Sequence, residues 1–85
     1  MWQIAFTKKA RADLLSLEKE IVKRIFSKLE KTKQDPESVF VRLVGSKYCK
    51  LRVGDYRVIA FLNKEEKLVE IRRVGHRRNI YRESP

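Results

Sequence analysis

The dipeptide Gly54-Asp55 is the strongest constraint on how this chain folds, because it separates two runs of alternating apolar and polar residues. Glycine at the first central position of a two-residue loop is typical of a type II′ hairpin turn. Such a loop places Arg52 opposite Arg57. Side chains alternate between the two faces of a strand, so one face of this hairpin is expected to join the core. Its residues are Cys49, Leu51, Val53, Tyr56, Val58 and Ala60.

The opposite face of the same hairpin collects cations. It is expected to carry Tyr48, Lys50, Arg52 and Arg57. Like charges that lie directly opposite each other destabilise a sheet. A face of this kind is therefore either well solvated or built to bind an anion.

A third strand is predicted after a second turn over residues 63–66. This turn puts Leu62 opposite Lys67, and the resulting register places Arg72 beside Arg57. The anion-binding interpretation then extends to a third arginine. The same register sends two apolar residues of the third strand, Val69 and Ile71, to the core face.

The charge balance favours a polyanionic partner. The chain has 85 residues, which is one domain (residues 1–85), and a net charge of +10. Residues 1–41 hold nine Lys and Arg against six Asp and Glu, a balance of +3. Residues 42–82 hold twelve against four, a balance of +8. The excess lies on the predicted sheet and the segment after it, and nucleic acid is the simplest partner.

The N-terminal half predicts one strand and a helical hairpin. Thr7 is a good N-cap, and Ser16 or Leu17 marks a break between two apolar patterns of helical period. Pro36 is expected to end the second helix. The fold class is therefore α+β, a small antiparallel sheet with an N-terminal helical hairpin packed on one face. The expected elements are a strand over residues 2–6, helices over 8–17 and 18–33, and an extended connector or short strand over 39–44.

The cellular location is predicted from what the sequence lacks. Cys49 is the only cysteine, so no internal disulfide can form, which fits a reducing compartment. No apolar run is long enough to span a membrane, and the N-terminus lacks the pattern of a signal peptide. We expect a cytoplasmic protein with no membrane partner.

The segment from Gly75 to Arg82 follows the last strand directly, and Gly75 permits a sharp turn there. One His and one Cys give no metal-ligand spacing and no catalytic triad, so we expect no metal and no cofactor. The remaining Lys, Arg, His and Tyr side chains can bind phosphate, stabilise a phosphorane, protonate a leaving oxygen and stack a base. From residue patterns alone, a basic α+β domain that binds nucleic acid is the interpretation.

Three runs resemble the RelE toxins of the RelE/ParE superfamily: L-R-V-G-D-Y-R-V-I-A-F, E-I-R-R-V-G-H-R-R-N-I-Y-R and V-R-L-V-G. The resemblance covers essentially the whole chain. It implies a compact microbial-RNase-like fold and a ribosome-dependent mRNA endoribonuclease that cuts mRNA in the ribosomal A site. It also implies a cognate RelB-type antitoxin and binding of operator DNA only as the toxin–antitoxin complex.

The resemblance also implies roles for individual residues. Lys50 matches the position that activates the nucleophile, Arg57 the one that stabilises the phosphorane, and Arg77 the one that assists the leaving group. Tyr81 matches a position that stacks on the substrate base. Arg52 matches a basic position that contacts RNA phosphate, and the other cations expected to bind RNA are Lys47, Arg72 and Arg78.

The chain departs from the family pattern at one position. Some members have a lysine where this sequence has Tyr48, and alternation would point Lys47 to the opposite face. His76 is an alternative general base or acid, because its unperturbed pKa lies near neutrality. Two rival functions share much of the evidence: a ParE-like poison of DNA gyrase, and a non-catalytic RNA-binding module. The combination of Lys50, Arg57, Arg77 and Tyr81 argues against the gyrase poison.

Overall fold

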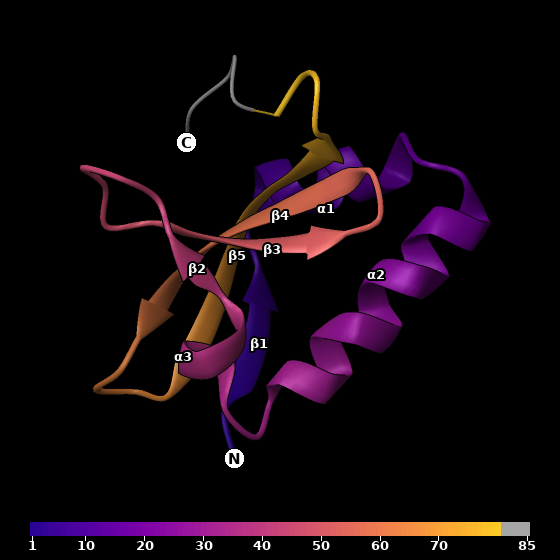
Figure 1. Ribbon diagram of the computed structural model, residues 1–85. Coiled ribbons are helices and arrows are strands. Elements are labelled where there is room, and N and C mark those ends of the chain that lie inside the picture. The colour runs from indigo at the N-terminus through magenta and orange to yellow at the C-terminus, as the bar shows by residue number, and fades with distance from the viewer. Residues whose placement is uncertain (81–85) are drawn as a thin grey trace.

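The computed structural model describes residues 1–80, which form a five-stranded sheet with α1 and α2 on one side (Figure 1). The strand order is β1-β5-β4-β3-β2. Neighbouring strands are antiparallel except at one edge, where β1 pairs parallel with β5. The elements are β1 (Gln3–Phe6), α1 (Lys8–Leu15), α2 (Lys19–Thr32), α3 (Pro36–Val39), β2 (Val41–Arg42), β3 (Cys49–Val53), β4 (Tyr56–Asn63) and β5 (Leu68–His76).

The predicted hairpin at Gly54 and Asp55 is confirmed. Arg52 lies opposite Arg57, and the pairing runs without interruption from the turn to the start of β3. Gly54 has a φ of +58°, a left-handed conformation that glycine adopts without the steric penalty of a Cβ atom. The hairpin therefore sends the predicted apolar residues of β3 and β4 toward the helices.

The predicted register of the second turn is wrong by two residues. Leu62 lies opposite Val69 rather than opposite Lys67. The side-chain oxygen Oδ1 of Asn63 accepts a hydrogen bond from the backbone N–H of Glu66 at 3.2 Å, and Lys67 adopts a left-handed φ of +51°. The loop therefore includes Lys67, and β5 begins one residue later.

The predicted neighbourhood of Arg57 and Arg72 is also wrong. Arg57 lies opposite Gly75, and the pairing of β4 with β5 shifts between Ile59 and Ala60. The shift is a β-bulge, which places one extra residue in β5. Arg72 is that extra residue, so the two guanidinium groups do not face each other across the strands.

The core lies between the sheet and the helical hairpin of α1 and α2. From α2, Ile25 and Leu29 are almost fully buried, and from β5 the predicted Val69 and Ile71 are inaccessible to solvent. Ala10 and Leu14 of α1 and the apolar residues of β3 and β4 complete the same cluster. The predicted packing of a helical hairpin on one face of the sheet is thus confirmed.

The helix boundaries follow from local capping. The side-chain oxygen of Thr7 accepts a hydrogen bond from the N–H of Ala10, which confirms the predicted N-cap of α1. Helix α1 ends at Leu15 with Ser16 as its C-cap, two residues before the predicted end. Pro36 does more than end a helix, because it is the first residue of α3, a position where its missing N–H costs nothing.

Gly75 is a strand residue and not the predicted turn. β5 continues through it to His76. A Cβ atom at Gly75 would lie 3.2 Å from Cδ1 of Ile80, which is buried. A side chain at this position would therefore crowd Ile80, which packs closely against the strand.

Candidate functional site

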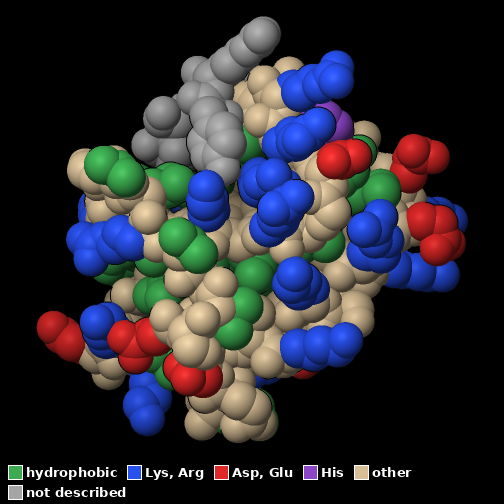
Figure 2. Space-filling model, in the orientation of Figure 1, with side chains coloured by type: hydrophobic (Ala, Val, Ile, Leu, Met, Phe, Trp, Pro, Cys, Tyr) green, Lys and Arg blue, Asp and Glu red, His purple; other side chains and the backbone are tan. Residues whose placement is uncertain are grey.

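The strongest candidate site is the basic face, which we define as the side of β3 and β4 that points away from α1 and α2. Alternation places Lys50 and Arg52 of β3 on it, together with Arg57 of β4. Lys and Arg side chains gather over the strands in Figure 2. Within residues 1–80, none of these three cations forms an ion pair with a carboxylate. The basic face therefore offers positive charge that the described part of the chain leaves unneutralised.

Arg57 is held in a fixed direction by the hairpin turn. Its Nη1 donates hydrogen bonds to the backbone oxygens of Gly54 and Tyr56, both at 2.9 Å. An arginine side chain has five N–H donors in a rigid plane. The guanidinium group is thus positioned by the backbone and keeps donors available for an anion.

Arg77 reaches the same turn from the other side. Its backbone N–H donates to the backbone oxygen of Asp55 at 2.8 Å, and its Nε lies 3.8 Å from Oδ1 of Asp55. Both side chains are about half exposed or more, so the ion pair contributes little stability. The structure therefore brings Arg57 and Arg77 together at the hairpin turn.

Lys50 lies farther along the basic face. It is half-buried and pairs with Ile59, which is 1% exposed. Of the cations predicted to bind RNA, Lys47, Arg52 and Arg78 are exposed, and Arg72 is half-buried.

His76 lies on the opposite face from Lys50. Its ring packs edge-on against Tyr56, with the ring centroids 5.4 Å apart. Its Nδ1 accepts a hydrogen bond from the backbone N–H of Arg78 at 3.2 Å. The structure therefore does not bring His76 into the group formed by Lys50 and Arg57.

Two aromatic rings extend the basic face. The Tyr48 ring lies between two cations, with Nζ of Lys47 at 5.5 Å and Cζ of Arg72 at 5.7 Å from its centroid. The same Nζ is 5.8 Å from the centroid of Phe61. Tyr81, the predicted base-stacking residue, lies outside the described residues. Aromatic rings interleaved with cations are typical of surfaces that bind single-stranded nucleic acid.

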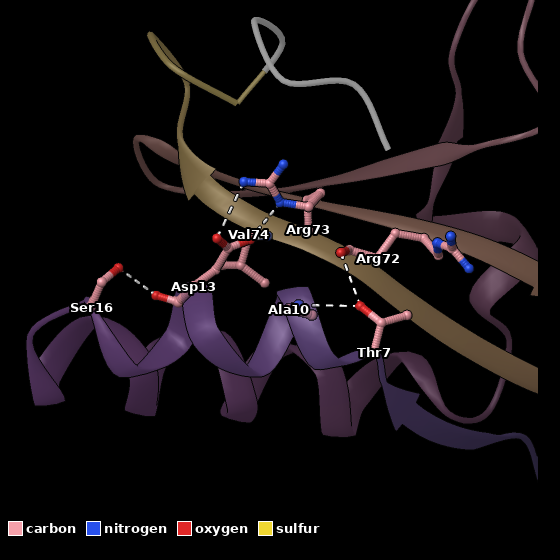
Figure 3. A network of polar contacts seen from close by, with 7 residues as sticks. All are labelled: Thr7, Ala10, Asp13, Ser16, Arg72, Arg73 and Val74. Carbon is pink, nitrogen blue, oxygen red and sulfur yellow. Dashed lines mark hydrogen bonds and ion pairs between the residues drawn. The ribbon is translucent and has the colours of Figure 1, made fainter.

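The sequence analysis missed Arg73, which links β5 to α1 (Figure 3). Its Nε donates to Oδ2 of Asp13 at 2.8 Å, and the backbone N–H of Val74 donates to the same oxygen at 2.9 Å. Nearer the start of α1, the hydroxyl of Thr7 donates to the backbone oxygen of Arg72 at 3.1 Å. The side chains of Thr7 and Asp13 thus form hydrogen bonds with backbone groups of β5 that lie beyond the residues paired with β1. The available signal was that Asp13 is the only acidic residue before Glu18.

Cys49 is not suited to act as a nucleophile. Its side chain is buried, and burial raises the pKa of the thiol, although the charges of Arg42 and Lys64 act in the opposite direction. A raised pKa leaves the thiol protonated near neutral pH, and the thiolate is the reactive form. Cys49 is therefore a core residue in this fold.

Residues 1–80 contain neither a metal-binding cluster nor a helix able to span a membrane. Among residues 1–80, no group of three or more His, Cys, Asp or Glu side chains is placed to hold a metal ion. No helix in this part of the chain is long and apolar enough to cross a membrane.

A second surface feature is the apolar groove, which lies between α1 and α2 and has a volume of about 650 Å³. Its most exposed apolar residues are Leu15, at 88% relative exposure, and Phe26, at 43%. Exposed apolar patches of this kind mark interaction surfaces in many proteins. The cations at its margin are Arg11, Lys19 and Lys23.

Comparisons with known proteins agree with this geometry. The family model described as the ParE toxin of the type II toxin–antitoxin system parDE matches residues 4–81. No curated protein sequence matches the chain.

Several solved structures have the same fold. The RelBE2 toxin–antitoxin complex from Mycobacterium tuberculosis matches with a TM-score of 0.79 and 27% identity, over 88% of this chain and 96% of that one. The RelB–RelE complex from Methanococcus jannaschii matches with a TM-score of 0.73 and 28% identity, over 94% and 98%. The intact Escherichia coli RelBE complex matches with a TM-score of 0.76 and 22% identity, over 89% and 96%. The chain therefore belongs to the RelE/ParE superfamily and is the toxin of a type II toxin–antitoxin system.

Proposed function

We propose that this toxin is a ribosome-dependent mRNA endoribonuclease that cuts mRNA in the ribosomal A site and so inhibits translation in the cytoplasm. The observation that carries the proposal is the basic face. Lys50, Arg52 and Arg57 lie there without a carboxylate partner in residues 1–80, next to the rings of Tyr48 and Phe61. Single-stranded RNA is bound by cations that contact its phosphates and by aromatic rings on which its bases stack. The basic face offers both.

The proposed chemistry is attack by the substrate's own 2′-hydroxyl on the adjacent phosphorus. The 2′ oxygen forms a bond to phosphorus, the bond from phosphorus to the 5′ oxygen breaks, and the products are a 2′,3′-cyclic phosphate and a 5′-hydroxyl. Negative charge develops on the phosphoryl oxygens in between. Fixed cationic donors stabilise such charge more than they stabilise the ground state.

The roles follow the positions on the basic face. Lys50 activates the 2′-hydroxyl, either by accepting its proton or through its positive charge. Arg57 stabilises the phosphorane with the donors that the turn leaves available, and Arg77 assists the departing 5′ oxygen. His76 remains the alternative base, but its position on the opposite face favours Lys50.

Base stacking completes the proposed site. Tyr81 is proposed to stack on a substrate base and to hold the in-line geometry that attack requires. Lys47, Arg72 and Arg78 are proposed to contact the RNA phosphates, together with Arg52. The arrangement around Tyr48 supports this, because cations and an aromatic ring lie within 6 Å of each other.

The proposed partner is a cognate antitoxin of the RelB type. The similar structures from M. tuberculosis and M. jannaschii are toxin–antitoxin complexes. An acidic antitoxin segment would neutralise the basic face, and an apolar helix face would fill the groove at Leu15 and Phe26. Operator DNA is proposed as a ligand of that complex rather than of the toxin alone.

The rival function is a poison of DNA gyrase. It is favoured by the description of the matching family model, which names a ParE toxin. Toe-print analysis of translating ribosomes separates the two proposals, because a ribosome-dependent nuclease produces cuts within the A-site codon. A gyrase supercoiling assay with the same preparation is the counterpart. Inhibition of gyrase without any cut on the ribosome would replace the proposed function with its rival.

A further inference from the structure

A second basic surface, the α2 groove, lies between α2 and the end of the β3–β4 hairpin. It has a volume of about 590 Å³ and is lined by four cations, Lys23, Arg24, Lys28 and Lys31. Its one acidic residue is Glu20, which is paired with Lys23 at 3.8 Å between exposed side chains. The sequence analysis assigned no role to these cations.

The cations of the α2 groove form a row along the helix. Arg24, Lys28 and Lys31 have the spacing i, i+4 and i+7, which places them on one face of a helix. Because an α-helix rises 1.5 Å per residue, Lys23 and Lys31 are about 12 Å apart along the axis. A stacked nucleic acid strand rises about 3.4 Å per nucleotide, so this row matches a few consecutive phosphates.

Two of these side chains are held in place by the hairpin. Nζ of Lys28 donates to the backbone oxygen of Arg52 at 2.8 Å. Nη2 of Arg24 lies so close to Gly54 that a Cβ atom there would be only 2.6 Å away. Lys28 is therefore joined to the hairpin by a hydrogen bond, and Arg24 lies close against the turn.

The α2 groove is continuous with the basic face. The carbonyl that accepts from Lys28 belongs to Arg52, whose side chain lies on the basic face, and the carbonyl of Gly54 accepts from Arg57. Cations thus surround the hairpin turn on both sides. A polyanion too long for one surface can contact both.

We propose that the α2 groove binds the phosphate backbone of a second RNA segment, separate from the strand that is cut at the basic face. This inference rests on the proposed function only in that the ligand is RNA. The composition of the lining favours a phosphate backbone over a peptide helix. Four of its residues are cations, and the only aliphatic side chains that an amphipathic helix could pack against are Val39 and Val53. The bound segment would hold the toxin in position while the basic face acts on the mRNA.

The test measures binding to an RNA that cannot be cut. A structured RNA hairpin with 2′-O-methyl groups throughout is titrated with the toxin at several salt concentrations, and anisotropy reports binding. The groove variant combines Lys23→Gln, Lys28→Gln and Lys31→Gln. The control variant has the same loss of charge at exposed positions away from both basic surfaces: Lys8→Gln, Lys9→Gln and Lys67→Gln.

We expect the groove variant to bind the hairpin at least tenfold more weakly than the control variant at 150 mM salt. The slope of log affinity against log salt should fall by roughly 2 to 3, since three phosphate contacts are lost. Circular dichroism must show that both variants are folded. Equal losses in the two variants, or tighter binding of a polyglutamate peptide than of the hairpin, would overturn the proposal.

The outcome is independent of the proposed nuclease activity. If the ribosome assay shows no cutting while the groove variant still loses the hairpin, the proposed function fails and the groove proposal stands. If cutting depends on Arg57 while the groove and control variants bind the hairpin alike, the proposed function stands and the groove proposal fails.

Discussion

The carboxylate of Asp13 joins α1 to β5 through Arg73, with Nε of the arginine 2.8 Å from Oδ2 of the aspartate. The two side chains are 12% and 19% exposed. The same oxygen also accepts the N–H of Val74, a strand donor that lies beyond the last residue paired with β1. One acidic side chain therefore accepts hydrogen bonds from both a mostly buried cation and a backbone N–H at the edge of the sheet.

Replacement of Asp13 by alanine should destabilise the fold by about 3 kcal/mol, because it removes the carboxylate that accepts from the mostly buried Arg73 and from the backbone N–H of Val74. Urea unfolding followed by circular dichroism measures the loss. The control is Glu30→Ala, which removes a more exposed ion pair with Lys33 and should cost about 1 kcal/mol or less. An equal loss in the free energy of unfolding for the two variants would show that the Asp13 contact stabilises the fold no more than a surface ion pair does.

Gly54→Ala should destabilise the protein more than Gly45→Ala does. Both glycines have a positive φ, which costs a residue with a Cβ atom about 1 to 2 kcal/mol. A Cβ atom at Gly45 meets nothing within 4 Å, whereas one at Gly54 would lie 2.6 Å from Nη2 of Arg24. In the Arg24→Ala background the difference between the two glycine variants should shrink, and thermal melting of the four proteins shows whether it does.

Local chemistry explains the parts of the fold that were predicted correctly. The Gly54-Asp55 turn sets the register of β3 and β4 by itself, because loop length and glycine position define a hairpin. The N-cap at Thr7 is likewise a property of a few consecutive residues. Patterns of this length are visible in a sequence.

The parts that were missed depend on packing between distant segments. The bulge at Ile59 and Ala60 and the left-handed conformation of Lys67 change the register of β5, and no turn dipeptide marks either of them. Gly75 was interpreted as a turn, but it is a strand residue against which Ile80 packs closely. The shared face of Lys50, Arg52 and Arg57 on β3 and β4 follows from the predicted register. Arg73 was missed, because its partner lies 60 residues away.

Arg57→Ala and Arg77→Ala, made singly, should each lower ribosome-dependent cleavage by about 100- to 1000-fold, the usual cost of losing one transition-state donor. Neither side chain belongs to the core cluster, so both variants should stay folded by circular dichroism. Lys9→Ala on α1 is the control and should cleave normally. Full cleavage by both arginine variants would remove these two residues from the proposed mechanism.

Association with the antitoxin should depend on salt through the basic face. Because ions screen charge steering, the association rate should fall roughly tenfold or more as salt rises from low to high concentration. Phe26→Ala in the apolar groove keeps the charge and should instead speed dissociation and leave the salt dependence of association unchanged. Stopped-flow kinetics separates the two rates, and an association rate that does not change with ionic strength would contradict a charge-driven encounter.

The central claim is that the substrate's own 2′-hydroxyl is the nucleophile, with Lys50, Arg57 and Arg77 acting on the phosphate. The most direct measurement compares ribosome-bound mRNA that has ribose or 2′-deoxyribose at the nucleotide 5′ of the cut. The account predicts that the single deoxy substitution stops cleavage, leaves binding nearly unchanged, and that the ribose substrate yields a 2′,3′-cyclic phosphate or its opened 3′-phosphate. Cleavage of the deoxy substrate at the ribose rate would show that water or a protein group is the nucleophile, and would contradict the account.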